Sequence, residues 1–328
     1  MNVRLLMLFQ KNMSKYTFLL PAYKGRFLDE MLNSIKNQTY PDFKVLISDD
    51  CSPENLKDIC EPYLQDERFS YRRNEKNIGG ENLVEHWNML VNMCDTDYLI
   101  MATDDDVYDP DFLFHINELV EAYPDVYVYR ARVRRIDEED TLLMKDMAYD
   151  EYQNQLEFLY HLYSFQYQRG IGNFVFKTDT LIQEGGFVSF PYAWYSDLAT
   201  EMLLAKQGIA HTKEILFNFR NSEINISNMK NSRNMSRGKM NAAIKYGEWF
   251  EQMIISQLDT RSKYNKQLTQ FVVLRYKKDL LWQFYHLIND FNFIECLKIV
   301  KRFKELNILT SSKERLLVLF HKIRYGLF

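Results

Sequence analysis

The segment from residue 16 to residue 102 alternates between short apolar stretches and longer amphipathic ones, which is the pattern of a parallel α/β sheet. The apolar stretches are predicted as strands at Tyr16–Pro21, Lys44–Ile47, Phe69–Arg73 and Tyr98–Ala102. The stretches between them are predicted as helices at Arg26–Gln38, Leu56–Leu64 and Asn82–Met93. Strands joined through helices run parallel, and their ligands bind beyond the carboxyl ends of the strands.

Unusual polar residues follow three of these predicted strands. Pro21-Ala22-Tyr23 ends the first, Asp49-Asp50 follows the second, and Asp104-Asp105-Asp106 follows the fourth. Because parallel strands end at one edge of a sheet, we expect these residues to lie close together. Adjacent carboxylates repel one another unless a cation lies between them, and hard divalent cations take oxygen ligands. The alternative for the triplet is a solvated acidic loop.

Composition narrows the class of protein. With 46% hydrophobic residues in a chain of 328, there are enough apolar side chains for a large core. A net charge of −4 argues against nucleic-acid binding. The four cysteines show neither paired nor zinc-binding spacing, which fits a reduced, cytoplasmic protein. No apolar run approaches the roughly 20 residues of a membrane span. Residues 1–14 are expected to be an extension.

Two common phosphate-binding motifs are absent from the sequence. No G-x-G-x-x-G follows the first predicted strand, and no G-x-x-x-x-G-K-[S/T] occurs anywhere. A dinucleotide site or a P-loop is therefore not expected. A nucleotide bound to this chain needs another device for its phosphates, and a metal ion held by Asp105 would supply one.

Three stretches of the first 110 residues resemble motifs of the family 2 glycosyltransferases, which have the GT-A fold. Leu20-Pro21-Ala22-Tyr23 resembles the opening V-P-x-Y element, and residues 48–52 resemble V-D-D-G-S. Residues 103–110 resemble the metal-binding D-x-D region, with Thr103 in place of the usual first Asp.

Two further stretches strengthen this resemblance. Asn77-x-Gly79 resembles the N-x-G turn before the third helix of the family. Residues 185–208 resemble its G-G-F … E-D … L-A-K-x-G stretch, with Ser196 in place of Glu and Asp197 kept. The resemblance implies an α/β fold of GT-A type, with one Rossmann-like, mostly parallel sheet flanked by helices and a C-terminal helical extension. It implies a catalytic domain at 15–225, divided into a nucleotide-binding half at 15–110 and an acceptor-binding half at 111–225, and a helical region at 226–328.

The resemblance also implies roles for the acidic triplet. Asp105 would hold a divalent cation, Mn or Mg, that bridges to the phosphates of a nucleotide-sugar. Asp104 would face the ribose hydroxyls, and Asp106 would help to hold the metal or its water. Because Thr103 replaces the common first Asp, the division of roles among the three carboxylates stays open.

The remaining donor site is expected at the other strand ends. Asp49 or Asp50 is expected to accept a hydrogen bond from a base such as uracil, and Tyr23 to stack on that base. The alternative for the two acids is N-capping of the helix that begins at Leu56. Pro21 and Ala22 would contribute backbone groups, and Asn77 and Gly79 are placed in the same nucleotide site.

Asp197 is the candidate general base, at the start of a helix predicted at Leu198–Gln207. Capping of that helix is the alternative. Trp194 and Tyr195, with Tyr192, are candidates for an acceptor platform, and packing is equally compatible with their pattern. Arg220, after a strand predicted at Ile215–Phe219, is a candidate contact to phosphate or acceptor, against a surface salt bridge. His211 is considered as a further metal ligand, against an ordinary strand histidine.

The last hundred residues differ in character from the rest. Residues 230–328 hold 19 Lys and Arg against 8 Asp and Glu, and the spacing of apolar residues over 239–326, including Ile294–Phe303 and Glu314–Ile323, predicts helices. They are expected either to touch an anionic membrane surface or to pack on the main domain or a second copy in a homodimer. The stretch Asn221–Gly238 is interpreted as a mobile loop over the donor or as a linker.

The resemblance implies an inverting glycosyltransferase that uses a nucleotide-sugar, with metal assistance from the acidic triplet. We expect the donor to be a UDP-sugar, in view of the base site, and the acceptor to be a glycan or lipid-linked glycan. The protein would be cytoplasmic, with possible peripheral membrane contact. The alternatives are a sugar-nucleotide nucleotidyltransferase and a relative that binds a nucleotide-sugar without turnover.

Overall fold

The computed structural model describes residues 14–164, 167–223, 225 and 232–309. The chain forms two compact units, which are described separately. The sheet unit comprises Met1–Gln153, Tyr167–Phe187 and Gln207–Ser222. The helical unit comprises Asn154–Gln166, Val188–Lys206 and Glu223–Phe328. The expected extension at 1–14 lies, except for its last residue, outside the described residues.

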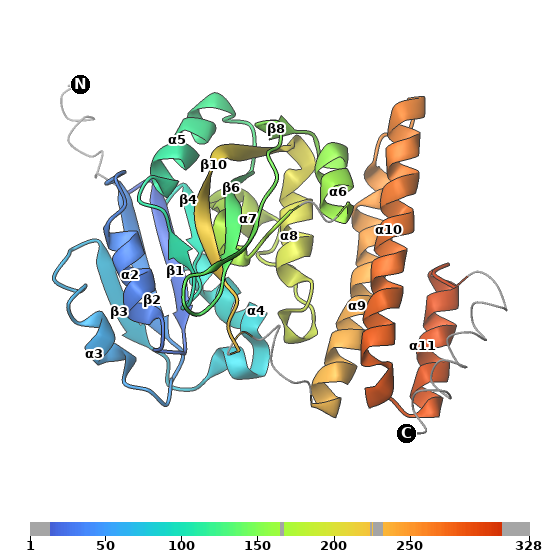
Figure 1. The fold of residues 1–328 in the computed structure, drawn as a ribbon, viewed down its shortest axis with the longest axis horizontal. Coiled ribbons are helices and arrows are strands. Elements are labelled where there is room, and N and C mark those ends of the chain that lie inside the picture. Colours follow the sequence, from blue (N-terminus) through green and yellow to red (C-terminus); the bar gives the residue numbers. More distant parts are fainter. Residues whose placement is uncertain (1–13, 165–166, 224, 226–231, 310–328) are drawn as a thin grey trace, which may run out of the picture. The chain divides into compact units, whose positions relative to one another are not determined.

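The sheet unit is built on one ten-stranded sheet in the order β3-β2-β1-β4-β9-β6-β10-β5, with β7 beside β6 and β8 beside β10 (Figure 1). The longer strands share one direction: β1 Tyr16–Ala22, β2 Phe43–Asp49, β3 Phe69–Arg73, β4 Tyr98–Met101, β6 Val128–Ile136 and β10 Ile209–Arg220. The short strands oppose them: β5 Val107–Tyr108, β7 Leu142–Lys145, β8 Tyr152–Gln153 and β9 Phe174–Lys177. The predicted α/β fold with an open, mostly parallel sheet is confirmed.

Helices cover both faces of this sheet because its strands are apolar on both sides. One face carries α2 Leu28–Lys36, α3 Leu56–Cys60 and α5 Phe112–Ala122, which share a buried cluster with the strands. In that cluster the Phe18 ring packs against Phe43, Tyr108 and Phe112. The helix α4 Ile78–Val91 contacts β1 on the other face, and α7 Thr178–Gln183 contacts β9.

The register of the parallel strands brings the predicted polar residues to one edge. Ala22 of β1 pairs with Asp49 of β2, and Asp49 pairs with Arg73 of β3. On the other side of β1, Leu19 pairs with Met101 of β4, so the acidic triplet begins three residues beyond that pair. The convergence expected from the alternating pattern is therefore present.

Element boundaries agree with the predictions to within a few residues. The strand predicted at Phe69–Arg73 has those bounds, whereas the one predicted at Ile215–Phe219 is part of a strand that begins at Ile209. The third helix begins at Ile78 instead of Asn82, because residues 78–80, which were expected to form a turn before the helix, form the start of the helix itself. Asn82 marks a kink in this helix, with φ −151° and ψ 95°.

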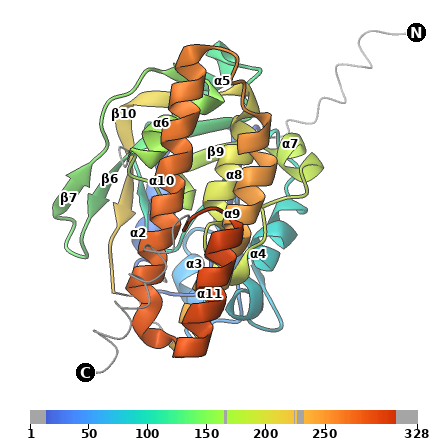
Figure 2. The ribbon, with the colours of Figure 1, turned by 90° about the vertical axis from the view of Figure 1, so that its right-hand side faces the viewer.

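The helical unit consists of α6 Gln155–Tyr163, α8 Ser196–Leu204, α9 Arg233–Met253, α10 Lys263–Leu287 and α11 Phe293–Glu305. Within the described residues of both units, short 3₁₀ turns lie at Ile171–Asn173, Pro191–Ala193, Ala205–Gln207, Ile255–Gln257 and Ile288–Asp290. Figure 2 shows α9, α10 and α11 side by side, and ion pairs join α9 to α11, as between Arg237 and Glu295 at 2.7 Å. Across the described residues, no helix is both long and apolar enough to span a bilayer.

Two predictions for the C-terminal part need comment. The loop interpretation of Asn221–Gly238 is wrong from Arg233 onward, because α9 begins there and the Ser232 hydroxyl accepts the Met235 N–H at 3.2 Å as its N-cap. Residues 224 and 226–231 of that stretch lie outside the described residues, as does the helix predicted at Glu314–Ile323. The prediction at Ile294–Phe303 is confirmed as part of α11.

Candidate nucleotide-sugar site

The acidic triplet lies directly after β4, and two of its carboxylates have defined partners. Asp104 accepts the backbone N–H groups of Tyr23 and Lys24 at 3.0 and 2.8 Å, so it joins the end of β4 to the end of β1. Asp106 accepts the N–H of Arg220 at 2.9 Å and the hydroxyl of Thr103. Thr103, which replaces the usual first Asp, therefore braces the loop from within.

Asp105 stands apart from its two neighbours. Asp105 is only 8% exposed. Burial and the negative charge of Asp104 raise the pKa of its carboxyl, while Lys24, Arg220 and a hydrogen bond from Thr103 oppose the rise, and the resulting pKa is about 6. Burial also raises the pKa of Asp104 and of Asp106. The loop thus holds negative charge that is incompletely compensated at neutral pH.

This arrangement fits a divalent cation that is shared with a ligand. Nowhere in the described ranges do three His, Cys, Asp or Glu side chains gather into a set that could hold a metal ion by themselves. Mg²⁺ is commonly bound by one or two carboxylates together with substrate phosphates. A nearby cation would favour the ionised form of a buried carboxylate, so Asp105, with Asp106 beside it, would hold the cation here.

Arg220 connects the acidic loop to distant parts of the sheet unit. Its guanidinium is 1% exposed and donates to the carbonyl oxygen of Asp105 at 3.0 Å, to Glu30 at 2.7 Å and to Asp140 at 2.7 Å. It also lies over the Phe27 ring, 4.4 Å from its centroid. These contacts make Arg220 a support of the loop. Its ion pairs with the partly exposed Glu30 and Asp140 agree with the salt-bridge alternative, although Arg220 itself is buried, and a contact with phosphate or acceptor stays a prediction.

Asp49 is buried within a network at the ends of β2 and β3. One of its carboxylate oxygens accepts the Ser52 N–H at 2.8 Å, and the other accepts the Tyr71 hydroxyl at 2.6 Å and the Arg73 guanidinium. Tyr71 and Arg73 were not singled out from the sequence. Arg73 could have been found from the ends of the predicted strands, because Asp49 and Arg73 are paired when β2 and β3 are aligned. A contact between Asp49 and a base stays a prediction.

Asp50 caps a helix, although not the one proposed as the alternative. It accepts the N–H groups of Ile78 and Gly79 at 2.9 and 2.6 Å, so it caps α4 and not α3. A Cβ atom on Gly79 would lie 2.8 Å from the Asp50 carboxylate, so only glycine allows this approach. Asn77 also caps α4, by accepting the Gly80 N–H at 2.6 Å. The N-x-G turn and the second Asp therefore form one structural element.

The backbone at the end of β1 completes this edge of the sheet. The Ala22 carbonyl accepts the Asp50 N–H at 2.9 Å, and the Tyr23 carbonyl accepts the Ser52 hydroxyl at 2.6 Å. Pro21 was predicted to end the strand, but β1 continues for one more residue to Ala22, so Pro21 lies inside β1, opposite Ser48. The Tyr23 side chain is 38% exposed, so its ring remains available to a ligand.

Asp197 belongs to the helical unit, where it lies in the first turn of α8. A strained turn precedes it: Tyr192, Ala193 and Tyr195 have φ values of 59°, 54° and 72°. Non-glycine residues seldom adopt this conformation, and such strain gathers at functional sites. This strain could not be expected from the sequence, since none of the three residues is glycine or asparagine.

The aromatic residues beside Asp197 are already packed within the helical unit. The Tyr195 ring stacks on Tyr246 at 4.4 Å, and its hydroxyl donates to Asp279 at 3.0 Å. The Lys239 ammonium lies over the Trp194 ring, 4.1 Å from its centroid. One ring face of each residue is thus used in packing, and an acceptor platform stays a prediction. In the sheet unit, His211 stacks on Tyr167 at 5.6 Å and joins no described metal-binding cluster, so its suggested metal role is not supported.

This chain is similar to known proteins in sequence and in structure. The chain is 27% identical over 97 residues to the poly(ribitol-phosphate) beta-N-acetylglucosaminyltransferase TarS of Staphylococcus aureus. That stretch covers 29% of this chain and spans only 17% of the relative. Among solved structures, residues 1–349 of S. aureus TarS in complex with UDP-GlcNAc match 94% of this chain and 88% of that one, with a TM-score of 0.62 and 15% identity.

A second solved structure shares the fold. A mannosyltransferase from Pyrobaculum calidifontis in complex with GDP-Man and Mn²⁺ matches 96% of this chain and 87% of that one, with a TM-score of 0.50 and 13% identity. The model of the family described as glycosyl transferase family 2 matches residues 17–195, which is more than half of the chain. The chain therefore belongs to glycosyl transferase family 2.

Proposed function

We propose that this protein is a metal-assisted, inverting glycosyltransferase that transfers a sugar from a UDP-sugar to a hydroxyl group of a glycan or lipid-linked glycan. The observation that carries the proposal is the burial and the raised pKa of Asp105 in a chain of glycosyl transferase family 2. Its carboxyl is buried at the carboxyl end of a parallel strand, and its pKa is raised to about 6. A site of this kind favours a bound positive charge and the diphosphate that accompanies it.

The proposed reaction needs three contributions. The acceptor hydroxyl attacks the anomeric carbon, the bond from that carbon to the diphosphate oxygen breaks, and UDP leaves with the bonding electron pair. We assign to Asp197, in the first turn of α8, the removal of the hydroxyl proton, because a positioned carboxylate can accept the proton of an attacking hydroxyl. A divalent cation, when bound by Asp105 and Asp106, would compensate charge on the leaving diphosphate. Asp104 is proposed to face the ribose.

The relatives support the choice of donor and metal without extending to the acceptor. The solved TarS structure holds UDP-GlcNAc, and the mannosyltransferase structure holds Mn²⁺. TarS is named for transfer to poly(ribitol phosphate), which makes that polymer the first acceptor to test. Tyr23, with its exposed ring, is proposed to stack on the uracil base.

Turnover with Asp197→Asn tests the proposal. We expect the wild-type protein to release UDP from a UDP-sugar and to form a product of inverted anomeric configuration, observed by NMR. The D197N variant should bind UDP as the wild type does and lose transfer, because the proton of the acceptor has no base. Asp259→Asn, at an exposed position of the same unit, is the matched control and should retain full activity.

Each other outcome of that assay has a defined meaning. Transfer by D197N at the wild-type rate would contradict the role of Asp197. Release of pyrophosphate in place of UDP would identify a nucleotidyltransferase. Binding of UDP-sugars by the wild type without any turnover would identify a non-catalytic binder.

We also propose peripheral contact with an anionic membrane through α11. Phe293, Ile294 and Leu297 are 49%, 64% and 42% exposed, and Lys298 and Lys301 lie within the same helix. Apolar residues beside lysines on one helix favour an anionic membrane surface. Co-sedimentation with vesicles that contain phosphatidylglycerol should be lost in an Ile294→Ser, Leu297→Ser variant. A dimer in light scattering that this variant converts to a monomer would instead support a homodimer contact.

A further inference from the structure

Arg135, on β6, carries a guanidinium group with an unusual environment. It lies over the Phe219 ring, 4.9 Å from its centroid, and its Nε atom is buried without a hydrogen-bond partner among the described residues. A buried donor of a charged group costs free energy when it has no acceptor. An acceptor supplied by a ligand would remove that cost.

A second guanidinium group lies near the first. Burial lowers the pKa of Arg135, the positive charge of Arg169 lowers it further, and the negative charge of Asp106 raises it. Arg135 therefore lies within electrostatic range of both Arg169 and the acidic loop. The Asp106 carboxylate accepts the Arg220 N–H and the Thr103 hydroxyl. It accepts no hydrogen bond from Arg135 Nε, which stays without an acceptor among the described residues.

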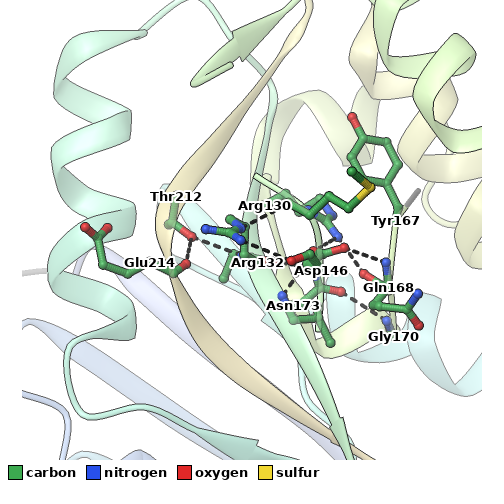
Figure 3. A network of polar contacts seen from close by, with 12 residues as sticks. Arg130, Arg132, Asp146, Tyr167, Gln168, Gly170, Asn173, Thr212 and Glu214 are labelled. Carbon is green, nitrogen blue, oxygen red and sulfur yellow. Dashed lines mark hydrogen bonds and ion pairs between the residues drawn. The ribbon is translucent and has the colours of Figure 1, made fainter. Parts of the chain in front are cut away.

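The backbone on the N-terminal side of Arg169 is held by a buried ion pair (Figure 3). Arg130 and Asp146 are paired with both side chains fully buried. The Asp146 carboxylate accepts the Gln168 N–H at 2.6 Å, while the Arg130 guanidinium donates to the Gln168 carbonyl. Both backbone groups of Gln168 are thus fixed by the same ion pair.

The backbone on the C-terminal side of Arg169 is held as well. The Gly170 N–H donates to the Asn173 side chain at 3.1 Å, and Asn173 donates to the Ala131 carbonyl of β6 at 2.7 Å (Figure 3). A Cβ atom on Gly170 would lie 2.6 Å from the Phe219 ring, so this backbone packs on the ring that also carries Arg135. The backbone of Arg169 is therefore held from both sides, next to the Phe219 ring that Arg135 covers.

We propose that Arg135 and Arg169 together bind a phosphate group of a substrate. This inference rests on the proposed function, and it adds an anion site formed by β6 and the segment 168–170. Paired guanidinium groups match the oxygens of a phosphate, and a site with its backbone already fixed loses little entropy when the anion binds. Two sources supply such a group: the diphosphate of the donor and a phosphodiester of the acceptor.

Binding measurements on Arg135→Gln and Arg169→Gln test the site and separate these sources. UDP and uridine are titrated in the presence of Mn²⁺, and poly(ribitol phosphate) is titrated at several salt concentrations. If the donor supplies the phosphate, both variants should bind UDP about tenfold or more weakly and uridine unchanged. If the acceptor supplies it, UDP affinity should stay constant while poly(ribitol phosphate) binds more weakly and with less salt dependence.

Controls keep the test decisive. Arg134→Gln removes the same charge one residue along β6, where the side chain donates to Asn218, and should bind every probe as the wild type does. Arg135→Lys keeps a charge and should recover part of the lost affinity. Thermal unfolding checks each variant, and R169Q with R135K carries the test if R135Q does not fold.

Two results would overturn the inference. If folded R135Q and R169Q bind UDP and poly(ribitol phosphate) within twofold of the wild type, the two arginines do not form a phosphate site, while the proposed function stands. If the wild type itself binds neither probe, the proposed function fails and the site fails with it.

Discussion

Arg220 Nε donates to the carbonyl oxygen of Asp105 at 3.0 Å, so the last residue of β10 fixes the backbone of the loop that follows β4. The same guanidinium reaches Glu30 on α2 and Asp140 after β6. Residues from four separate parts of the sequence thus meet around one buried side chain. The position of the Asp105 carboxylate depends on these contacts, so we expect Arg220 to act on the proposed metal and donor site by holding this loop.

Substitution of Arg220 by lysine should weaken both the fold and the site. Lysine lacks the fork of donors that reaches three groups at once, so we expect a loss of about 1–3 kcal/mol in the free energy of unfolding. Urea unfolding measures this loss, and calorimetry should show weaker Mn²⁺-dependent UDP binding. Arg26→Lys is the control, because the Arg26 side chain is 52% exposed in its pair with Glu138, and pairs at the surface are worth under about 1 kcal/mol. Equal stability of R220K and R26K would contradict this role.

Substitution of Asp105 by asparagine should stabilise the metal-free protein. The folded pKa of about 6 lies above the unfolded value, so above pH 6 the ionised carboxylate opposes folding. Removal of that charge should raise the free energy of unfolding at pH 8 by about 1–3 kcal/mol. Urea unfolding with a chelator measures the gain. The gain should vanish at a pH below 4, where the carboxyl is protonated in the folded and the unfolded state. A D105N variant that is less stable than the wild type at pH 8 would refute this prediction.

His86 should make stability depend on pH. It is buried, its Nε2 contacts the Ser48 hydroxyl at 3.1 Å, and its Nδ1 lies 3.4 Å from Asp50. Burial lowers its pKa, which Asp50 partly opposes. Because the unfolded chain binds the proton first, stability present above about pH 6.5 is lost as the pH falls below that value.

The His86→Gln variant isolates this effect from that of other groups. The difference in unfolding free energy between wild type and variant should shrink as the pH falls from 7 to 5, because only the wild type loses the contribution of His86. Parallel curves for wild type and H86Q over this range would show that His86 does not titrate as expected.

Removal of one member of the Arg130–Asp146 ion pair should destabilise the fold strongly, whereas replacement of both members by apolar residues should destabilise it less. Both side chains are fully buried, so Asp146→Asn leaves an unpaired buried guanidinium and should cost about 3–5 kcal/mol. The double variant Arg130→Met, Asp146→Leu should recover a substantial part of that loss, because no charge remains buried. Chemical unfolding measures both variants, with Asp259→Asn as an exposed control of little effect. A D146N variant as stable as the control would be inconsistent with this burial.

The sequence predicted this fold well where structure follows from local pattern. The strand Phe69–Arg73 and the polar ends after β1, β2 and β4 are set by short apolar runs and by turn residues beside them. The role of Arg220 could not be predicted, because its partners Glu30 and Asp140 lie 190 and 80 residues away. The same holds for Asp50, which caps a helix 28 residues further along instead of the next one.

The binding of UDP and Mn²⁺ to wild type and to Asp105→Asn, measured by calorimetry, tests the central claim most directly. We predict that Mn²⁺ strengthens UDP binding to the wild type by about tenfold or more and that D105N, although folded, loses this gain. Asp95→Asn, an exposed carboxylate of the sheet unit, should behave as the wild type does. Equal Mn²⁺-dependent gains in wild type and D105N, or no gain in the wild type, would contradict a cation held by the acidic loop.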